Sequence, residues 1–348
     1  MDPLSIAHEN VSKHTSGQYN KNDIVKGYDF NQGLDWDKVF ESYRTMGIQS
    51  TNLSRAIDTV KKMMSWSNEK GEKCKIFLGY TSNMVSCGVR EIIRFLCEHK
   101  MVDVIVTTTG AIEEDLIKCK DAMYIGNFTM NDKQLRAEGV NRIGNMLIPN
   151  DNYCNFEDWI MPIFDEMHEK QTKEGFNWTP SKSIDFFGQK INNKESIYYW
   201  CHVNKISVYC PAFTDGSIGD MLYFHSYKKP GLRIDLVEDI RGINNHAFGI
   251  PCSGAIILGG GVIKHHILNA NLMRNGLDYT VIINTAIEYD ASDAGASPSE
   301  ALSWGKISLE GIFVKIYSEA SLVFPILVGM TFAKKYFEDK KEEELKSK

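Results

Sequence analysis

The sequence lacks the features that mark several classes of protein. It has no C-x-x-C pair among its eight cysteines, no apolar run of the roughly 18 residues that span a bilayer, and no apolar signal segment near residue 1. No basic cluster stands out apart from the mixed-charge end KKYFEDKKEEELKSK, and the formal net charge is −6. These absences predict a cytoplasmic chain with free thiols, without a metal site, and without a nucleic acid or membrane partner.

The alternation of short apolar stretches with helical patterns predicts an α/β fold. With 348 residues, 43% of them hydrophobic, the chain can bury a large core. We expect a Rossmann-like parallel sheet flanked by helices, because near-continuous Val/Ile runs are typical of strands covered on both faces. One helix is expected to begin at Ser82 or Asn83 and run through VSCGVREIIRFLCEH. The expected strands are CKIFLGYT, VDVIVTTTG, KISVYCPA, SGAIILGGG, DYTVIINTA and FVKIYSEA.

The flanking segments differ in composition from this alternating part. Residues 1–25 are polar and are interpreted as a flexible N-terminal helical arm, and residues 336–348 as a charged tail. Residues 26–335 are expected to form a single catalytic domain. A helical excursion packed on that domain is expected near residues 127–200, where Asn, Asp, Trp and Tyr are frequent.

The stretch SPSEALSWGKI places an acid, an indole and an amine in one short element. Ser297 can cap a helix that places Glu300 and Trp304, four residues apart, on one face. Gly305 is expected to end the helix directly before Lys306. A lysine beside an indole and an acid can act as an amine nucleophile, and the same surface can bind a cationic ligand. The alternative is a solvated lysine, the usual state of that residue.

The loops expected after the strands are rich in glycine and hydroxyl groups. Ligands of parallel sheets bind at these carboxyl ends, and the loops TSN, TTTG, FTDGS, GGG, NTA and SEA suit a dinucleotide. The run Gly259–Gly261 is not G-x-G-x-x-G, so it could mark only a tight turn. In the following helix, His265 lies near the N-terminal end and could act as a base or simply pack, whereas His266 receives no catalytic role.

Acidic residues gather in sequence around Lys306. Asp290, Asp293 and Glu300 precede it closely, and they could bind a cation or merely complement helix ends. Together with the aromatic and amine groups they indicate an enzyme that handles a polyamine with a nucleotide cofactor.

Motifs throughout the chain resemble the deoxyhypusine synthase family. They are FLGYTSN, VDVIVTTTGAIEEDLIKC, RIGNMLIP, NYCNFEDW, CPAFTDGSIGDM, FHSYKKPGL, SLVFPILV and the long run from GGGVIKHH to SWGKI. The similarity covers about residues 22–335 in matching order. It implies a transferase of hypusine biosynthesis that uses NAD to move the 4-aminobutyl group of spermidine to one lysine of the translation initiation factor 5A precursor. It also implies release of 1,3-diaminopropane.

The resemblance implies a role for individual residues. Lys306 would form the transient imine, and His265 would be the base. The residues implied to bind spermidine are Glu113, Glu114, Asp220, His265, Asn269, Asp290, Ala291, Ser292, Asp293, Glu300, Trp304 and Lys306. The residues implied to bind NAD are Ser82, Asn83, Met84, Val85, Ser86, Thr108, Thr109, Gly110, Glu114, Asp215, Gly260, Thr285, Ala286, Glu319 and Ala320. A homotetramer with sites at subunit interfaces, closed against water in a deep tunnel, is implied as well.

Three positions depart from the family pattern. The family usually has glycine at Ala291, aspartate at Glu319 and alanine at Thr109. These departures leave two alternatives to the active synthase. One is a weakly active regulatory paralogue in a hetero-oligomer, although Lys306 is retained. The other is a homospermidine synthase, which would use putrescine as acceptor.

Overall fold

The computed structural model describes residues 2–12, 17, 20, 22 and 24–346, and the chain divides into two compact units, residues 1–54 and 55–348. The expected N-terminal arm contains helix α1 (Pro3–Val11), which Asp2 caps. The remaining arm positions 1, 13–16, 18–19, 21 and 23, and positions 347–348 of the tail, lie outside the described residues. The first unit continues with η1 (Phe30–Gln32), α2 (Trp36–Glu41) and α3 (Tyr43–Met46), and α4 (Ile48–Ser65) begins in it.

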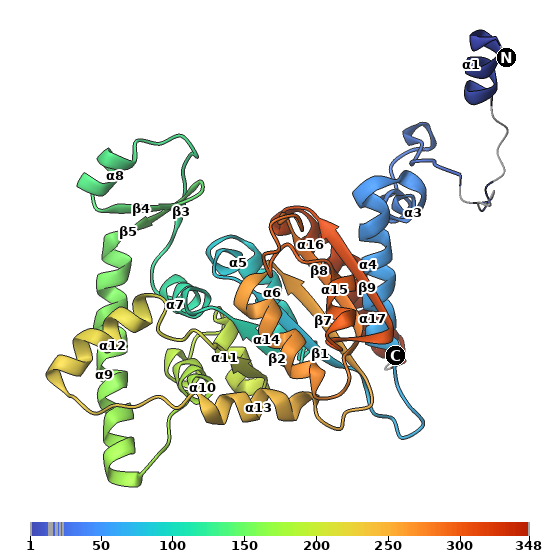
Figure 1. Cartoon of the computed structure of the whole chain (residues 1–348). Helices are drawn as coiled ribbons and strands as arrows, with labels where there is room; N and C mark the ends of the chain where they lie inside the picture. Colours follow the sequence, from blue (N-terminus) through green and yellow to red (C-terminus); the bar gives the residue numbers. More distant parts are fainter. Residues whose placement is uncertain (1, 13–16, 18–19, 21, 23, 347–348) are drawn as a thin grey trace. The chain divides into compact units, whose positions relative to one another are not determined.

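A six-stranded parallel sheet forms the centre of the second unit (Figure 1). Its order is β6-β2-β1-β7-β8-β9, and every neighbouring pair is parallel. The chain adds strands outward in one direction from β1 and in the other from β7, which is the strand order of a Rossmann fold. The strands are β1 (Lys75–Tyr80), β2 (Val104–Thr107), β6 (Ser207–Tyr209), β7 (Ser253–Leu258), β8 (Leu277–Asn284) and β9 (Ile307–Tyr317). The expected fold class is confirmed.

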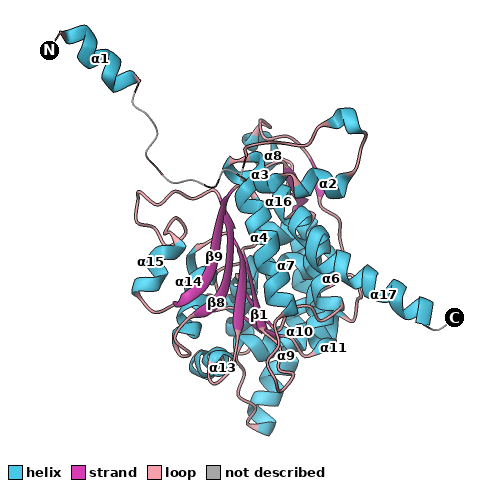
Figure 2. Cartoon of the chain, turned by 90° about the vertical axis from the view of Figure 1, so that its right-hand side faces the viewer, coloured by secondary structure: helices cyan, strands magenta, loops and turns pink. Residues whose placement is uncertain are grey.

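Helices cover both faces of this sheet, as Figure 2 shows. Connections between parallel strands are right-handed, so helices that follow strands added in opposite directions lie on opposite faces. One face carries α13 (Val237–Ala247), α14 (Gly261–Leu272) and α15 (Pro298–Ser303). The other carries α6 (Val89–Glu98), α7 (Thr109–Lys118) and α16 (Ala320–Val328). Fully buried Phe77 of β1 and Ile263 and Ile267 of α14 belong to one apolar core cluster, which fixes α14 on the sheet.

The helix expected to begin at Ser82 or Asn83 and run to His99 is interrupted. Its first part is the short helix α5 (Asn83–Ser86), and α6 begins only at Val89. Cys87 between them is extended, with ψ 179°, and is followed by Gly88. Glycine weakens a helix interior, which explains the break at this point. The break leaves α5 as a separate turn directly after β1.

The excursion between β2 and β6 contains a small second sheet besides its helices. The three short antiparallel strands β3 (Tyr124–Ile125), β4 (Val140–Ile143) and β5 (Met146–Pro149) pair in the order β3-β5-β4. Figure 1 shows them with α8 (Asp132–Ala137) at one end of α9 (Asn150–Glu174), away from the main sheet. The elements α10 (Pro180–Ile191), α11 (Ile197–Asn204) and, after β6, α12 (Ser217–Lys228) complete this side.

The C-terminal part is one continuous helical run, Ala320–Lys346. It consists of α16, the π-helical turn η2 (Gly329–Ala333) and α17 (Lys334–Lys346). Among the described residues, this run alone is long and apolar enough to cross a membrane by length and composition, and 33% of its most apolar window is buried. The evidence is weak, because a helix packed in a protein core passes the same test; Phe324 and Leu327 are buried here. The long apolar stretch ends at Ala333 and charged residues predominate after it, so the sequence alone did not indicate this length.

Candidate active site

Several of the predicted cofactor residues lie where the strand order reverses, between β1 and β7. The loops after these two strands lie side by side, because β1 and β7 are paired in register up to Tyr80 and Leu258. Ser82 follows β1, and its hydroxyl lies 2.7 Å from that of Thr108, which follows β2. Ligands of Rossmann folds bind in such a crevice, so the sheet brings the predicted loops to one place.

Two glycines in these loops are required by close approach of the backbone. A Cβ on Gly110 would lie 2.5 Å from Ser82 Oγ, and one on Gly260 would lie 2.4 Å from Ala294 Cα. A methyl group fits neither position without displacing the neighbour. Gly260 therefore does more than turn the chain: it lets the loop from residue 286 to 296 pack onto the start of α14.

Some predicted cofactor residues use their side chains within the protein. The hydroxyl of Thr109 is buried and donates to Ala212 O at 2.7 Å, so it is turned toward the β6 loop. Glu319 is the N-cap of α16, where its carboxylate accepts from Ser321 N at 3.0 Å. Both departures from the family pattern thus have a role in local structure, and helix capping accounts for an acid at position 319.

Lys306 is positioned by the end of α15, as the sequence predicted. Ser297 caps this helix and Pro298 is its first residue. Gly305 has a left-handed φ of 69°, its N–H donates to Leu302 O at 3.0 Å, and the N–H of Lys306 donates to Ala301 O at 3.0 Å. These two bonds form a Schellman motif, which fixes the backbone of Lys306 just before β9.

The amine of Lys306 meets the two groups that the sequence singled out. Its Nζ lies 3.3 Å from His265 Nε2 on the first turns of α14, and 5.5 Å from the ring centre of Trp304. The two residues are 41 positions apart in the chain. Trp304 is 64% exposed, so one side of this pair is open in a single chain. The neighbouring His266 is half-buried, and burial lowers its pKa.

Two buried acids of α7 behave differently from one another. Glu113 accepts from Ile218 N at 2.8 Å at the start of α12, and burial raises its pKa to about 7. It thus holds the helix whose first turn carries Asp220, whose charge also acts on Glu113. Glu114 also has a raised pKa through burial, which a hydrogen bond from Ser86 opposes. Its Oε2 is buried and has no partner among the described atoms, so it can accept from a ligand.

The other predicted acids lie in or beside the loop from residue 286 to 296. Asp290 is exposed and accepts from Ser292 N at 2.8 Å, which lowers its pKa. Asp293 has a buried Oδ2 with no partner among the described atoms. Glu300 is exposed on α15. The buried Oδ2 of Asp293 suits an ammonium group, because a buried acceptor without a donor is costly.

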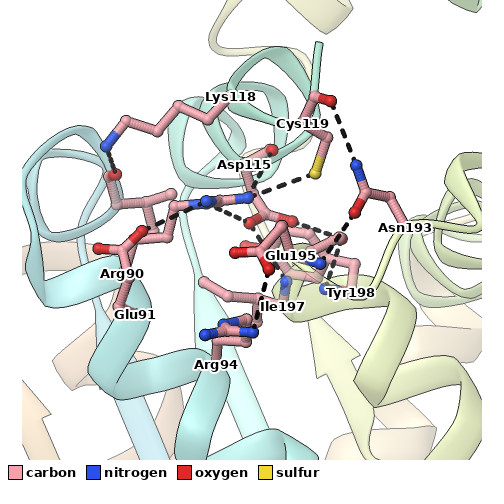
Figure 3. A network of polar contacts seen from close by, with 12 residues as sticks. Arg90, Glu91, Arg94, Asp115, Lys118, Cys119, Asn193, Glu195, Ile197 and Tyr198 are labelled. Atoms are coloured by element: carbon pink, nitrogen blue, oxygen red, sulfur yellow. Dashed lines mark hydrogen bonds and ion pairs between the residues drawn. The ribbon is translucent and has the colours of Figure 1, made fainter. Parts of the chain in front are cut away.

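A network of buried and half-buried polar groups around α7 fixes that helix (Figure 3). Asp115 accepts from Arg90 Nε at 2.7 Å, Ser196 Oγ at 2.6 Å and Ile197 N at 3.2 Å. Lys118 donates to Val85 O and Ser86 O of the short α5 turn. α7 is therefore held to α6, α5 and α11 by contacts that no local sequence pattern indicates.

The titration of Glu113 gives a testable dependence of stability on pH. Its pKa is about 7 in the fold against an ordinary 4.5. The group contributes stability that is complete below pH 4.5 and is lost as the pH rises through 7. Relative to Glu113→Gln, the free energy of unfolding of the unchanged chain should fall by up to about 3 kcal/mol across this window. Urea titrations at several pH values measure this difference, and parallel curves for the two proteins would contradict it.

Ala291 adopts a conformation that an L-residue rarely adopts. Its φ is +56°, in the left-handed region that glycine enters without a steric penalty. Ala291→Gly is therefore expected to raise the free energy of unfolding by about 1 kcal/mol. Ala296→Gly in the same loop, where φ is not positive, serves as control and should lower it. Denaturant midpoints test both; a loss of stability in Ala291→Gly would show that the position is unstrained.

Comparison with known proteins agrees with this geometry. A family model described as deoxyhypusine synthase matches residues 38–331. The probable deoxyhypusine synthase of Dictyostelium discoideum is 58% identical over 336 residues, which cover 92% of this chain and 89% of that protein. The deoxyhypusine synthase of Arabidopsis thaliana is 52% identical, covering 95% of this chain and 96% of that one.

A solved structure is similar over nearly the same extent. The putative deoxyhypusine synthase of Entamoeba histolytica has a TM-score of 0.68 at 37% identity, and the match covers 89% of this chain and 97% of that one. The match to the family model alone extends over most of the chain, and the curated relatives agree in the enzyme they name. The chain therefore belongs to the deoxyhypusine synthase family and is an enzyme of this type.

Proposed function

We propose that this chain transfers the 4-aminobutyl group of spermidine to one lysine of the translation initiation factor 5A precursor and releases 1,3-diaminopropane. The observation that carries the proposal is the contact between Lys306 Nζ and His265 Nε2 at 3.3 Å. It pairs a nucleophilic amine with a base. The indole of Trp304 and the acids around the pair supply the environment that a polyamine requires.

Binding of spermidine rests on carboxylates without partners and on the indole ring. Asp293 offers a buried oxygen without a partner among the described atoms, and Glu114 offers another on α7. Asp220, Glu300 and the ring of Trp304 are exposed and would supply the remaining contacts to the polyamine. Ammonium groups can satisfy such oxygens by charge-assisted hydrogen bonds, which are stronger than neutral ones.

The crevice between β1 and β7 suits NAD as the cofactor. Ser82, Thr108, Gly110, Gly260, Thr285 and Asp215 would hold it, and the hydroxyls of Ser82 and Thr108 already lie 2.7 Å apart there. When bound, NAD supplies a hydride acceptor and returns the hydride at the end, so no net oxidation occurs. Glu114 would contact both the cofactor and the polyamine, and its place next to Ser86 of the α5 turn supports the cofactor contact.

Between the removal of the hydride and its return, the residues of the chain carry out the transfer of the aminobutyl group. His265 accepts a proton as spermidine is oxidised. The free amine of Lys306 then attacks the oxidised carbon, a C–N bond forms to the aminobutyl group, and 1,3-diaminopropane leaves. The acceptor lysine displaces Lys306 by the same exchange. Because water would hydrolyse the imine, the site must be closed to solvent.

A second copy of the chain is the proposed cover of the exposed side. The strand β9 is an edge strand, and Leu309 on it is 82% exposed while Trp304 beside it is 64% exposed. Exposed apolar groups along an open edge favour association. A homotetramer with sites between subunits would bury them. A cytoplasmic location is part of the same proposal, and it agrees with the eight free cysteines.

The two alternatives differ from this proposal in acceptor or in activity. A regulatory paralogue would not need the Lys306–His265 contact, which argues for the active enzyme. A homospermidine synthase would keep the same donor site and would differ only in accepting putrescine.

The first half of the reaction tests the proposal without any acceptor. Mixing the chain with spermidine and NAD should produce enzyme-bound NADH, seen by its absorbance or fluorescence, together with 1,3-diaminopropane. Adding the factor precursor should then consume the NADH. A chain that produces neither product with spermidine would contradict the proposal, and consumption by putrescine but not by the precursor would favour the homospermidine synthase.

A further inference from the structure

Two lysines that the sequence analysis did not single out bind the same acid-rich loop. Lys264 of α14 donates to the main-chain oxygens of Asp293 and of Ala296, the latter at 3.0 Å. Lys315 of β9 donates to Ala286 O at 3.1 Å and to Gly295 O at 2.6 Å. The two ammonium groups thus reach four carbonyls between residues 286 and 296. Lys315 stands inside the otherwise apolar segment FVKIY, and this unusual position is the sequence feature that could have identified it.

The same loop is fixed from a third element. Asn284, the last residue of β8, donates from Nδ2 to Gly259 O at 2.9 Å and to Ala294 O at 3.1 Å. Ala294 also lies against Gly260, where no Cβ fits. The loop is therefore attached to α14, β8 and β9 at once, and its position is tied to the glycine turn at the proposed cofactor crevice.

The lysines bind the backbone and leave the carboxylate of Asp293 unused. Lys264 is only 2% exposed, and burial of an ammonium is costly unless its donors are satisfied. Here it takes the main-chain oxygen of Asp293, while Oδ2 of that residue is buried without a partner among the described atoms. Charge balance explains why cations are placed there: Glu288, Asp290 and Asp293 lie within one short loop and repel one another.

We infer that Lys264 and Lys315 are positioning residues that hold loop 286–296, and through it the carboxylate of Asp293, in the form that binds the polyamine before the polyamine arrives. They act as internal counter-ions of the loop and do not themselves touch the reacting atoms. The inference rests on the proposed function for the identity of the ligand, but the attachment of the loop can be tested without it.

Two charge-removing variants of similar length test this role. Lys264→Met and Lys315→Met remove the ammonium groups, and Lys315→Arg keeps a cation at the half-buried position. Lys182→Met is the matched control, because Lys182 is also half-buried and binds Asn177 O and Glu238, on elements away from the loop. Each protein is measured by hydrogen–deuterium exchange of residues 286–296 and by calorimetric binding of spermidine in the presence of NAD.

The expected result is faster exchange in loop 286–296 and a spermidine Kd at least tenfold higher in both Met variants. kcat at saturating spermidine should stay within about threefold, and Lys315→Arg should recover most of the affinity. Unchanged exchange in the loop, or an equal loss of affinity in Lys182→Met, would overturn the inference. If the unchanged chain binds no spermidine, the proposed function fails, while the exchange rates still decide whether the lysines hold the loop.

Discussion

Replacement of Lys306 by alanine should lower the rate of aminobutyl transfer at least about a thousandfold, because the variant has no amine to carry the group between donor and acceptor. The Schellman motif that ends α15 uses only main-chain atoms of residue 306, so the backbone should keep its position. The loss should appear in kcat and not in folding. Borohydride reduction during turnover would add one aminobutyl unit to the unchanged chain and none to Lys306→Ala, as intact mass of the enzyme would show.

An exposed lysine provides the control for this experiment. Lys335 lies on α17 in a surface ion pair with Asp339, and Lys335→Ala should retain both the rate and the trapped adduct. A trapped adduct of normal yield in Lys306→Ala would place the covalent chemistry on another residue. Retention of more than about a tenth of the rate would contradict a covalent role, since nucleophile variants lose far more.

Loss of Asp115 should cause the largest change in stability. The carboxylate is fully buried and accepts from Arg90, Ser196 and Ile197, as Figure 3 shows. Asp115→Ala leaves the guanidinium of Arg90, itself only 4% exposed, without its main partner. Breaking a buried pair in this way costs about 3–5 kcal/mol. Urea unfolding followed by circular dichroism at a fixed protein concentration measures the loss.

A matched ion pair on the surface separates burial from charge pairing. Arg142 and Asp132 form a contact of the same 2.7 Å length, but Asp132 is exposed. Asp132→Ala should therefore lower stability much less than Asp115→Ala. Replacing Arg90 and Asp115 together by apolar residues should recover part of the loss, since no unpaired charge remains. Equal losses in Asp115→Ala and Asp132→Ala would contradict the account of this network.

Loss of the Arg90–Asp115 pair should also disturb the proposed active site. Asp115 lies next to Glu113 and Glu114 in α7, and Lys118 of the same helix holds the α5 turn that follows Ser82. The network therefore orients the acids and the proposed cofactor turn together. We infer that it contributes to the site by fixing this helix, without contact to the reacting groups.

The sequence predicted those parts of the molecule that depend on local pattern. The apolar runs gave the six parallel strands, and the caps of α15 followed from Ser297, Pro298 and Gly305. The proximity of Lys306 to His265 came from the family resemblance, because spacing alone cannot bring together residues on α14 and before β9. Strand pairing between β8 and β9 does so in the structure.

The features that the sequence did not predict depend on contacts across long stretches of chain. The carboxylate of Glu113 accepts from Ile218 N, 105 residues away. The hydroxyl of Thr109 bonds to Ala212 O, 103 residues away. The attachments made by Lys264 and Lys315 are of the same kind. Local periodicity in the sequence does not indicate such distant partners. The break at Gly88 shows in addition that one glycine can divide an expected helix.

The central claim is tested most directly by the intact mass of the translation initiation factor 5A precursor after incubation with this chain, spermidine and NAD. The account predicts a gain of one aminobutyl unit on one lysine, dependent on NAD and absent with Lys306→Ala. An unchanged precursor, with spermidine and NAD both bound by the chain, would contradict it and would point to a free diamine as acceptor or to a required second subunit.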